Sequence, residues 1–316
     1  ITLATLAPLN YEASGVPTGA GIPGAPTAFD TGRMARLLGG LGNPHAALLS
    51  VHVVGTKGKG STAALLSSIL HTAGVNTGTY TSPHVVDLTE RIAVGGAPLR
   101  RADLDALAAA AAPALGRALG PGGAHPTWFE AVTALALRHF ADAGVEVAIM
   151  EAGLGGGTDA TNVWGDGEAE GGAATRPPAA VIATPVDLEH AAALGGSLAA
   201  VAASKASILA RPGVPLILAG QAHAEAEAAF TDRAAGLGCP VVRVERVASI
   251  EHAGVEVEAG EARGATPTTA LRLVLDGQAI NDALGKAATS PLPPSITVDA
   301  RLRLVGGHQA ANAAAA

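Results

Sequence analysis

The chain has 316 residues, a formal net charge of −7, one cysteine and 48 % hydrophobic residues. The negative charge and the scattered Lys and Arg argue against nucleic acid as a partner, because binding a phosphate backbone needs clustered basic side chains. A single cysteine excludes a disulfide framework and a cysteine-based metal site, and no apolar run reaches the roughly 18 residues of a membrane helix. At about 150 residues per domain, the length predicts two domains, or one large domain and part of another.

Apolar strands alternate with helices through most of the chain. In chain order, the pattern predicts helix 29–41, strand 51–54, helix 61–73, strand 77–80, helix 102–119, helix 127–143, strand 145–150, strand 181–184, helix 197–210, strand 215–218, helix 222–236 and strand 241–244. This alternation predicts an α/β fold with a mostly parallel sheet flanked by helices on both faces. One helix, 61–73, is expected to place Leu65, Leu66, Ile69 and Leu70 on a single face.

The remaining segments are rich in Gly, Pro and Ala or lack a clear period. Residues 1–28 are expected to form a flexible arm, 121–123 a turn and 165–178 a surface loop. Residues 245–304 carry only short β-like runs, such as Leu271–Leu275, and the pattern does not place them.

The segment Val51–Thr62, VHVVGTKGKGST, is an apolar strand that runs into a glycine-rich turn and the start of a helix. Backbone N–H groups and the helix dipole at such a start favour a bound phosphate. Lys59 adds a positive charge, and the glycines allow phosphate oxygens to approach the backbone. The segment therefore predicts an ATP site made by the loop residues Gly55, Thr56, Lys57, Gly58, Lys59, Gly60 and Ser61. The common P-loop pattern has Ser or Thr directly after the lysine; here Gly60 stands there, and a functionless turn is the alternative.

Four further side chains follow strands or lie on a helix near this edge of the predicted sheet. Ser82, after strand 77–80, can supply a hard oxygen ligand to Mg²⁺, or can belong to an ordinary Ser-Pro turn. Glu151 closes the strand 145–150, which is a favoured position for a magnesium ligand. His190 is a metal ligand or merely polar, and Lys205 either places charge in the site or extends its amine to solvent.

Separate segments together resemble the folylpolyglutamate synthase and dihydrofolate synthase family of Mur-ligase-like, ADP-forming ligases. The matching text is FDTGRMARLLGGLGNPH (29–45), VHVVGTKGKGST (51–62), YTSPHVVDLTERI (80–92), FEAVTALALRHF (129–140), EAGLGGGTDATNV (151–163), DLEHAAALGGSLAAVAASKASI (187–208) and GGHQAANAAAA (306–316). The wording of the first block and of the AGLGG and DATNV segments is most similar to the dihydrofolate synthetases of plants and algae.

The resemblance implies a domain plan and a role for each candidate. Residues 29–305 would form the Mur-ligase-like central ATPase domain, and 306–316 would begin a C-terminal region. Ser82, Glu151 and His190 would hold Mg²⁺, Lys205 would be carbamylated and help to hold a second metal, and Asn312 would lie near adenine. The pterin substrate would lie along Phe29, Asp30, Thr31, Gly32, Pro126, Thr127, Trp128, Phe129, Thr158, Asp159 and Ala160.

The activity implied by the resemblance joins L-glutamate to dihydropteroate through an acyl phosphate at the expense of ATP. Lys59 and Mg²⁺ would stabilise the transferring phosphoryl group. Two alternatives stay open: a folylpolyglutamate synthase that adds glutamate to tetrahydrofolate, and an inactive ATP-binding module. A monomer in the mitochondria or the cytoplasm is expected, without a membrane partner.

The chain departs from the family pattern at several positions. Ser207 replaces a usual Gly, Gly157 replaces a usual Arg or Ala, and Pro185 lies in the approach to the histidine. The sequence stops at Ala316, so the family's C-terminal Rossmann-like domain is expected to be missing, and residues 1–316 are expected to bind Mg-ATP with little turnover.

Overall fold

The computed structural model describes residues 31–118, 125–164, 174–256, 268–285, 290–302 and 307–316. Several sequence expectations therefore lie outside the described residues: the arm at 1–28, the turn at 121–123, most of the loop at 165–178, and the substrate candidates Phe29 and Asp30. No helix in the described part of the chain is long and apolar enough to cross a membrane.

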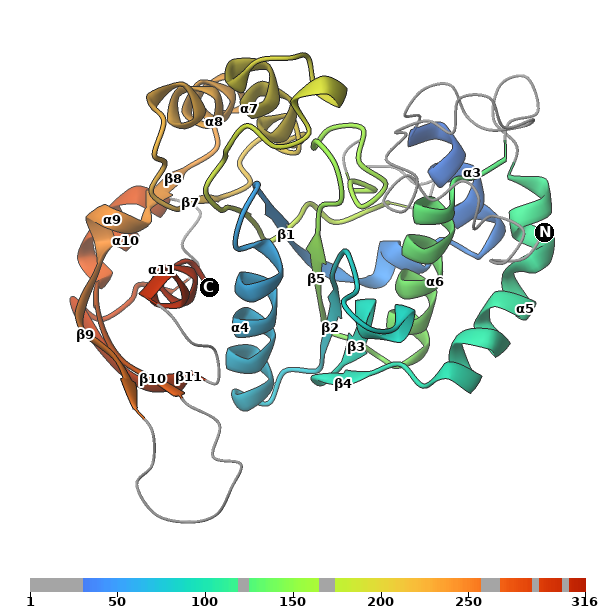
Figure 1. Ribbon diagram of the computed structural model, residues 1–316, viewed down its shortest axis with the longest axis horizontal. Helices are drawn as coiled ribbons and strands as arrows, with labels where there is room; N and C mark the ends of the chain where they lie inside the picture. The colour runs from blue at the N-terminus through green and yellow to red at the C-terminus, as the bar shows by residue number, and fades with distance from the viewer. Residues whose placement is uncertain (1–30, 119–124, 165–173, 257–267, 286–289, 303–306) are drawn as a thin grey trace, which may run out of the picture.

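An eight-stranded sheet forms the centre of the molecule (Figure 1). Its order is β4-β3-β2-β5-β1-β6-β7-β8. The bounds are β1 Leu49–Val54, β2 Thr77–Tyr80, β3 Ile92–Val94, β4 Ala97–Pro98, β5 Val147–Glu151, β6 Ala180–Ala183, β7 Leu216–Leu218 and β8 Val241–Arg243. All pairs from β2 to β8 are parallel, and only β3 and β4 add antiparallel strands at one edge. The mostly parallel sheet predicted from the sequence is therefore confirmed.

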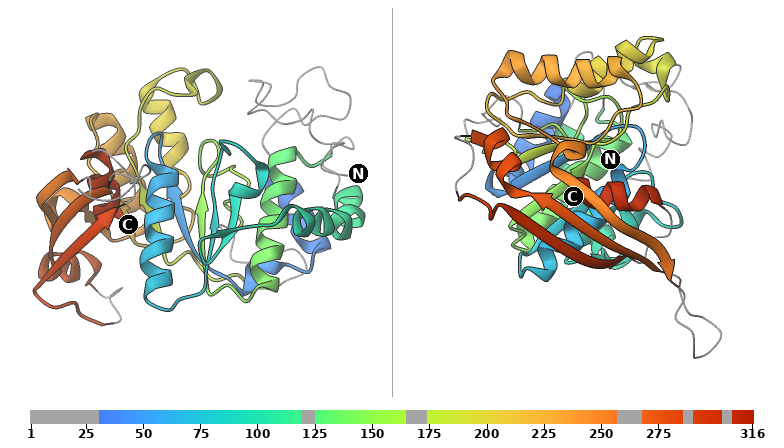
Figure 2. Two further views of the ribbon diagram at one scale, coloured as in Figure 1. Left: turned by 60° about the horizontal axis from the view of Figure 1, so that its bottom comes forward. Right: turned by 90° about the vertical axis from the view of Figure 1, so that its left-hand side faces the viewer.

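Helices cover both faces of this sheet, as the continuous apolar runs of its inner strands require. They are α3 Thr31–Gly40, α4 Lys59–Thr72, α5 Arg101–Arg117, α6 Trp128–Asp142, α7 Leu198–Ala206 and α8 Ala224–Leu237. Val53 and Ile149 pack with α4 on one face. On the other face Met150 packs with α3, α5 and α6, while Ala183 packs with α7 and α8. Figure 2 shows the two sets of helices on opposite sides of the strands.

Residues 244–315 form a second unit with a three-stranded antiparallel sheet in the order β11-β10-β9. Its elements are α9 Val244–Val247, β9 Ala248–Glu256, β10 Thr268–Asp276, α10 Gly277–Leu284, β11 Ser295–Leu302 and α11 Gly307–Ala315. Helix α11 lies between this sheet and α4, where Leu273 and Ala313 pack together with Leu65. Within this unit, residues 245–304 are the part that the sequence pattern did not place.

Most predicted elements are present with shifted ends. Helix α4 starts at Lys59, two residues early, because Gly58 takes the left-handed conformation (φ 86°) and caps the helix. Strand β5 includes Glu151 as its last residue, and α7 ends at Ala206, well before residue 210. On the apolar face of α4, the side chain of Leu66 is buried, whereas that of Ile69 is 52 % exposed.

Candidate nucleotide-binding site

The carboxyl ends of the parallel strands bring four predicted segments to one edge of the sheet. Gly55 follows β1, Ser82 follows β2 and Glu151 closes β5, and Thr184 follows β6. Ligands of open α/β sheets bind outside this edge, so the architecture places the loop and its candidate partners where a ligand is expected.

The loop between β1 and α4 needs its glycines. Gly55 and Gly58 have φ angles of 144° and 86°, which residues with a side chain rarely adopt. A Cβ on Gly55 would lie 2.0 Å from Oγ1 of Thr184, and one on Gly58 would lie 2.5 Å from Oδ1 of Asn312. Both backbone conformation and close approach therefore fix these two positions.

The segment after β6 supports the loop from its side. The N–H groups of Thr56 and Lys57 both donate to the carbonyl oxygen of Pro185, at 2.9 and 3.2 Å. The Thr56 hydroxyl accepts from the Asp187 N–H and donates to the Asp187 carbonyl. Strand β6 ends at Ala183, so Pro185 removes no hydrogen bond from the sheet. The departure at Pro185 thus leaves the strand intact and contributes an acceptor to the loop.

The start of α4 supplies the donors that a phosphate can use. The first intrahelical bond runs from the Thr62 N–H to the Gly58 carbonyl. The N–H groups of Lys59, Gly60 and Ser61 precede it in the first turn and have no acceptor within the helix. Together with the positive end of the helix dipole, they form an anion-binding arrangement.

Lys59, Glu151 and Ser82 lie together at this helix start. Lys59 Nζ is 3.8 Å from Oε1 of Glu151 and donates to the Thr56 carbonyl at 3.2 Å. The Ser82 N–H donates to Oε2 of Glu151 at 3.2 Å. The carboxylate of Glu151 is almost fully buried, and a buried charge of this kind needs paired partners. Lys59 and Ser82, predicted from separate segments, therefore both contact the predicted Glu151.

Lys57, the other loop lysine, points to a different partner. Its Nζ donates to Oδ2 of Asp187 at 2.8 Å, and both side chains are exposed. The hydrogen bond and charge of Asp187 raise the pKa of Lys57, and Lys57 in turn lowers the pKa of Asp187. In this state the Lys57 side chain contributes to holding the loop against the segment after β6.

Lys205 is buried on α7 and donates to the Gly55 carbonyl at 2.7 Å. Burial, and to a smaller extent the positive charge of Lys59, lower its pKa to about 8, against the opposing effects of Asp159 and Glu189. The alternative that Lys205 extends its amine to solvent is thereby excluded. A lysine with this pKa has a substantial free-amine fraction near neutral to mildly basic pH.

Two departures from the family pattern, Gly157 and Ser207, contact each other. The Gly157 N–H donates to Oγ of Ser207 at 2.7 Å. A Cβ on Gly157 would lie 2.8 Å from the same oxygen. The serine at 207 therefore accounts for the glycine at 157, a pairing that their separation in sequence conceals.

His190 lies exposed in the loop after β6, in the left-handed conformation with φ 58°. In the described ranges no group of three or more His, Cys, Asp and Glu side chains is arranged to hold a metal. The predicted set of Ser82, Glu151 and His190 contains only two such residues, so the role of His190 stays a prediction. Ser82 and Glu151 offer the oxygen atoms that Mg²⁺ prefers, and this donor chemistry fits the ion.

The predicted pterin residues are distributed between a helix start and a loop. Thr31 and Gly32 begin α3, and a salt bridge of 3.0 Å from Arg33 to Glu130 joins that helix to the start of α6. There Thr127 caps α6, while Pro126, Trp128 and Phe129 are buried. Trp128 and Phe129 belong to the hydrophobic core, so they can support such a site from behind.

The predicted loop residues Thr158, Asp159 and Ala160 differ in exposure. Thr158 is exposed and Ala160 is partly buried, whereas Asp159 is buried and accepts from the N–H groups of Leu154 and Thr161. Burial raises the pKa of Asp159. The contacts assign Asp159 to holding the loop, a role that its sequence position did not indicate.

A cavity of about 620 Å³ opens beside the phosphate loop. Lys57, Gly58 and the predicted Asn312 line it on one side. Asn312 is buried and donates to Oε1 of Gln309 at 3.0 Å. The sequence did not identify the wall contributed by Glu245 and Ile250, because these residues lie in the region that it could not place.

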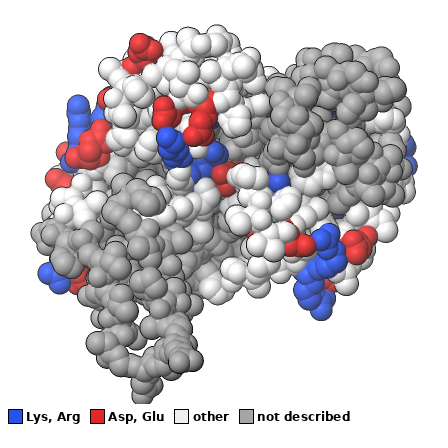
Figure 3. Space-filling view, in the orientation of Figure 1, with Lys and Arg blue, Asp and Glu red and all other residues white. Residues whose placement is uncertain are grey.

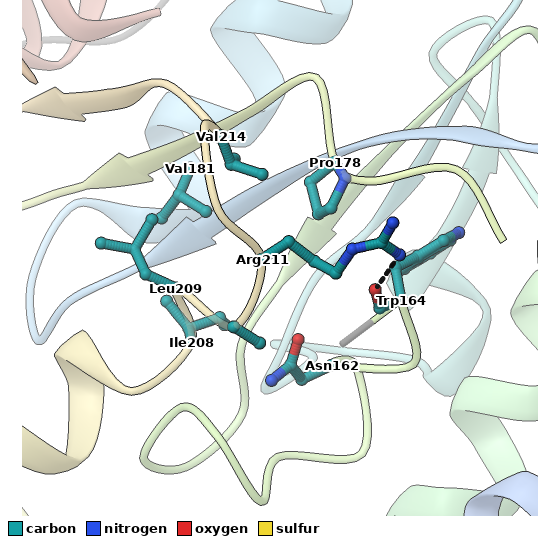
Figure 4. A pocket seen from close by; sticks show the side chains of 9 residues that line it. Asn162, Trp164, Pro178, Val181, Ile208, Leu209, Arg211 and Val214 are labelled. Atoms are coloured by element: carbon teal, nitrogen blue, oxygen red, sulfur yellow. Dashed lines mark hydrogen bonds between the residues drawn. The ribbon is translucent and has the colours of Figure 1, made fainter. Parts of the chain in front are cut away.

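A smaller space near Trp164 is filled by its own side chains. Asn162, Trp164 and Arg211 surround it (Figure 4), and Arg211 donates to the Trp164 carbonyl at 3.5 Å. A water-sized molecule does not fit inside. Behind it, the buried His52 donates Nε2–H to the Thr161 carbonyl at 2.9 Å and packs edge-on against Trp164. This cluster is part of the core.

Charges on the face seen in Figure 3 are mixed. Acidic and basic side chains are interspersed there, and the described residues form no large area of one sign. The loop and its neighbours thus define the chain as an α/β protein with a glycine-rich phosphate loop at the ligand edge of a parallel sheet.

Known proteins place the chain within that class. No family model matches it. It is 35 % identical over 284 residues to a probable bifunctional folylpolyglutamate synthase/dihydropteroate synthase of Haloferax volcanii, covering 90 % of this chain and 29 % of the relative. A dihydrofolate synthase/folylpolyglutamate synthase of Mycobacterium tuberculosis is 32 % identical over 291 residues, covering 89 % of this chain and 52 % of the relative.

The solved structure of a protein that shares the name folylpolyglutamate synthase with these relatives has a similar fold. Mycobacterium tuberculosis folylpolyglutamate synthase complexed with ADP superposes with a TM-score of 0.72 and 27 % identity, over 91 % of this chain and 57 % of that one. Over about 90 % of its length the chain is thus similar to proteins named as folylpolyglutamate synthases and dihydrofolate synthases. It spans 29 % of the length of the Haloferax volcanii relative and 52 % of the length of the Mycobacterium tuberculosis relative.

Proposed function

We propose that this chain provides the ATP-binding and phosphoryl-transfer machinery of a ligase that joins L-glutamate to a folate-type acceptor. The observation that carries the proposal is the meeting of Lys59, Glu151 and Ser82 at the free N–H groups of α4. The relative that binds ADP has the same fold, which supports a nucleotide at this loop.

In the proposed reaction, a carboxylate oxygen of the acceptor attacks the γ-phosphorus of ATP. The bond to the β,γ-bridging oxygen breaks, and ADP leaves with that electron pair. Lys59 and the N–H groups of Lys59, Gly60 and Ser61 stabilise the charge on the transferring oxygens. The α-amine of L-glutamate, as the free base, then attacks the acyl phosphate carbonyl, phosphate leaves, and the amine loses a proton.

Magnesium is part of this proposal. Ser82 and Glu151 would hold the ion, with His190 as the third ligand implied by the family. Bound Mg²⁺ would offset the charge of the β- and γ-phosphate oxygens. Lys205, with its pKa lowered to about 8, would be available as the free amine that carbamylation by CO₂ requires.

We assign dihydropteroate as the acceptor, which makes the activity that of a dihydrofolate synthase. The support is the similarity of the FDTGRMARLLGGLGNPH and DATNV segments to such enzymes. Addition of glutamate to tetrahydrofolate is the second candidate, because the names of the relatives include both activities. With the chain saturated by AMPPCP, dihydropteroate should bind more tightly than tetrahydrofolate; the reverse order would overturn the assignment.

Lys59→Ala tests the ATP site. Removing one charged donor costs about 1.5–3 kcal/mol, so binding of Mg-AMPPCP should weaken by roughly 10- to 150-fold. Titration calorimetry at fixed salt measures the change. Adenosine, which has no phosphate, should bind equally to both proteins.

The matched control is Arg100→Ala, which removes an exposed positive charge that pairs with Asp103. It should leave AMPPCP affinity unchanged. Equal affinity of the Lys59 variant and the parent for AMPPCP would show that the loop is a structural turn.

A further inference from the structure

The cavity beside the phosphate loop is bounded by both parts of the molecule. Gly58 of the loop and Gly220 after β7 belong to the larger sheet, whereas Ile250 of β9 and Ala314 of α11 belong to the smaller unit. In Figure 1 these elements meet at the left of the sheet, next to α11. At about 620 Å³, the space is within the range of sites for small molecules and cofactors.

Three residues with polar side chains line this cavity: Lys57, Glu245 and Asn312. Lys57 donates a hydrogen bond to the carboxylate of Asp187, and Asn312 donates one to the side-chain oxygen of Gln309. Glu245 makes no hydrogen bond or ion pair with any residue that the structure describes. It is therefore the acidic group of the wall with its oxygen atoms available to a ligand.

The side chain of Glu245 lies close to the backbone of Gly220. Its Oε2 lies 3.7 Å from where a Cβ on Gly220 would be. The carboxylate thus lies over the Gly220 backbone, where a side chain at that position would come into van der Waals contact with it.

The rest of the wall is apolar. Val244, Ala219 and Ala248 are among its residues, and Ile250 is 43 % exposed although it is a large hydrophobic side chain. Such a surface suits the flat face of a nucleobase. The Asn312 amide can in addition bond to the edge of that base.

These features define one orientation for a nucleotide bound in the cavity. Its phosphates would bind at Gly58 and the start of α4, and its base would pack against the apolar wall. A carboxylate repels phosphate and accepts hydrogen bonds from hydroxyl groups. Of the three parts of a nucleotide, the ribose diol is the one that supplies two adjacent O–H donors.

We propose that Glu245 accepts hydrogen bonds from the 2′- and 3′-hydroxyls of the ribose and makes the site selective for ribonucleotides. This inference rests on the proposed ATP binding and adds a specificity-determining residue to it. One hydrogen bond to a charged group changes affinity by roughly tenfold or more.

The test is a thermodynamic cycle in which the ribose hydroxyls of the ligand and the carboxylate of Glu245 are removed separately and together. Calorimetry measures the binding of Mg-ATP and of Mg-2′,3′-dideoxyATP to the parent chain and to Glu245→Ala. The parent should prefer ATP about tenfold. The variant should bind the two nucleotides equally, with its affinity for dideoxyATP close to that of the parent. Glu245→Gln, which keeps one acceptor oxygen, should retain part of the preference.

Glu225→Ala is the matched control, because it removes an exposed carboxylate at the start of α8, away from the cavity wall. It should keep the full preference for ATP and thereby exclude a general effect of net charge. Inosine triphosphate should bind the parent and the Glu245 variants with the same ratio as ATP, since it keeps the diol and lacks the 6-amino group.

The outcomes separate the two proposals. An undiminished preference for ATP in Glu245→Ala overturns the role of Glu245 while ATP binding stands. If the affinity ratio between the parent and the Glu245 variants differs for inosine triphosphate and ATP, Glu245 contacts the 6-amino group of the base. That result would also overturn the proposed contact with the ribose. If the folded parent chain binds neither nucleotide, the proposed function itself fails.

Discussion

The two sheets of this protein are built on different principles. The eight-stranded sheet is mostly parallel and has helices on both faces, and Val53, Ile149 and Ala183 of its strands are fully buried. The three-stranded sheet is antiparallel, and Ile250 and Val298 on its strands are 43 % and 39 % exposed. Parallel strands need such cover, whereas an antiparallel sheet can present one face to solvent.

This difference indicates that the larger sheet contributes more to stability and that the smaller sheet can change conformation more easily. The phosphate loop is anchored in the larger sheet, whose core is dense. The nucleoside end of the proposed site is walled in part by the smaller sheet and α11. A bound nucleotide would therefore join a rigid half to a half with fewer buried contacts.

The largest expected effect is in the core of the larger sheet. Phe230 on α8 is fully buried, so Phe230→Ala should lower the free energy of unfolding by about 3–5 kcal/mol. Urea denaturation followed by circular dichroism measures this. Ile69→Ala is the control, because its side chain is 52 % exposed on α4, and the change should stay within about 0.5 kcal/mol. Equal losses in both variants would contradict the assigned burial.

The next effect is pH dependence from the buried His52. Burial lowers its pKa to about 4, against a usual value of 6.5. As pH falls below 6.5 the unfolded chain takes up a proton that the folded chain does not, so stability is lost between pH 6.5 and 4. The loss should approach about 3 kcal/mol.

His45 adds to the same pH dependence, since burial also lowers its pKa to about 4. Denaturation series at several pH values measure the slope. His52→Leu should flatten it, while His71→Ala, at an exposed position of α4, should leave it unchanged. An unaltered slope in His52→Leu would assign the acid sensitivity to other groups.

The smallest expected effect is in the smaller sheet. Ile250→Ala should change the free energy of unfolding by less than about 0.5 kcal/mol, because Ile250 is 43 % exposed on the smaller sheet. Mg-ATP affinity should fall by roughly two- to fivefold, since a base covering this side chain would remove part of it from water. Val298→Ala, which alters an exposed residue of β11 outside the cavity wall, should affect neither quantity. A large loss of stability in Ile250→Ala would contradict the inferred difference in stability between the two sheets.

Sequence reasoning succeeded where local pattern and structure agree. Apolar runs bounded by glycine marked the strands of the larger sheet, and the VHVVGTKGKGST segment placed the loop at the correct strand end. The clustering of Lys59, Glu151 and Ser82 was accessible because carboxyl ends of parallel strands meet at one edge.

The rest depends on contacts that no local pattern encodes. The smaller sheet has an irregular register between Arg272 and Leu273 and exposed faces, so its strands lack a continuous apolar signal. The pairing of Gly157 with Ser207 joins residues about 50 apart. Glu245 is an ordinary charged residue in sequence, and only the cavity distinguishes it.

The carbonyl of Pro185 has one more consequence. It accepts hydrogen bonds from the N–H groups of Thr56 and Lys57, and the ring of Pro185 fixes the φ torsion of that residue. The shape of the loop is thus established when the chain folds, so an arriving phosphate meets donors that are already oriented. Recognition at this loop would then resemble docking onto a rigid template, with little loss of chain entropy at the moment of encounter.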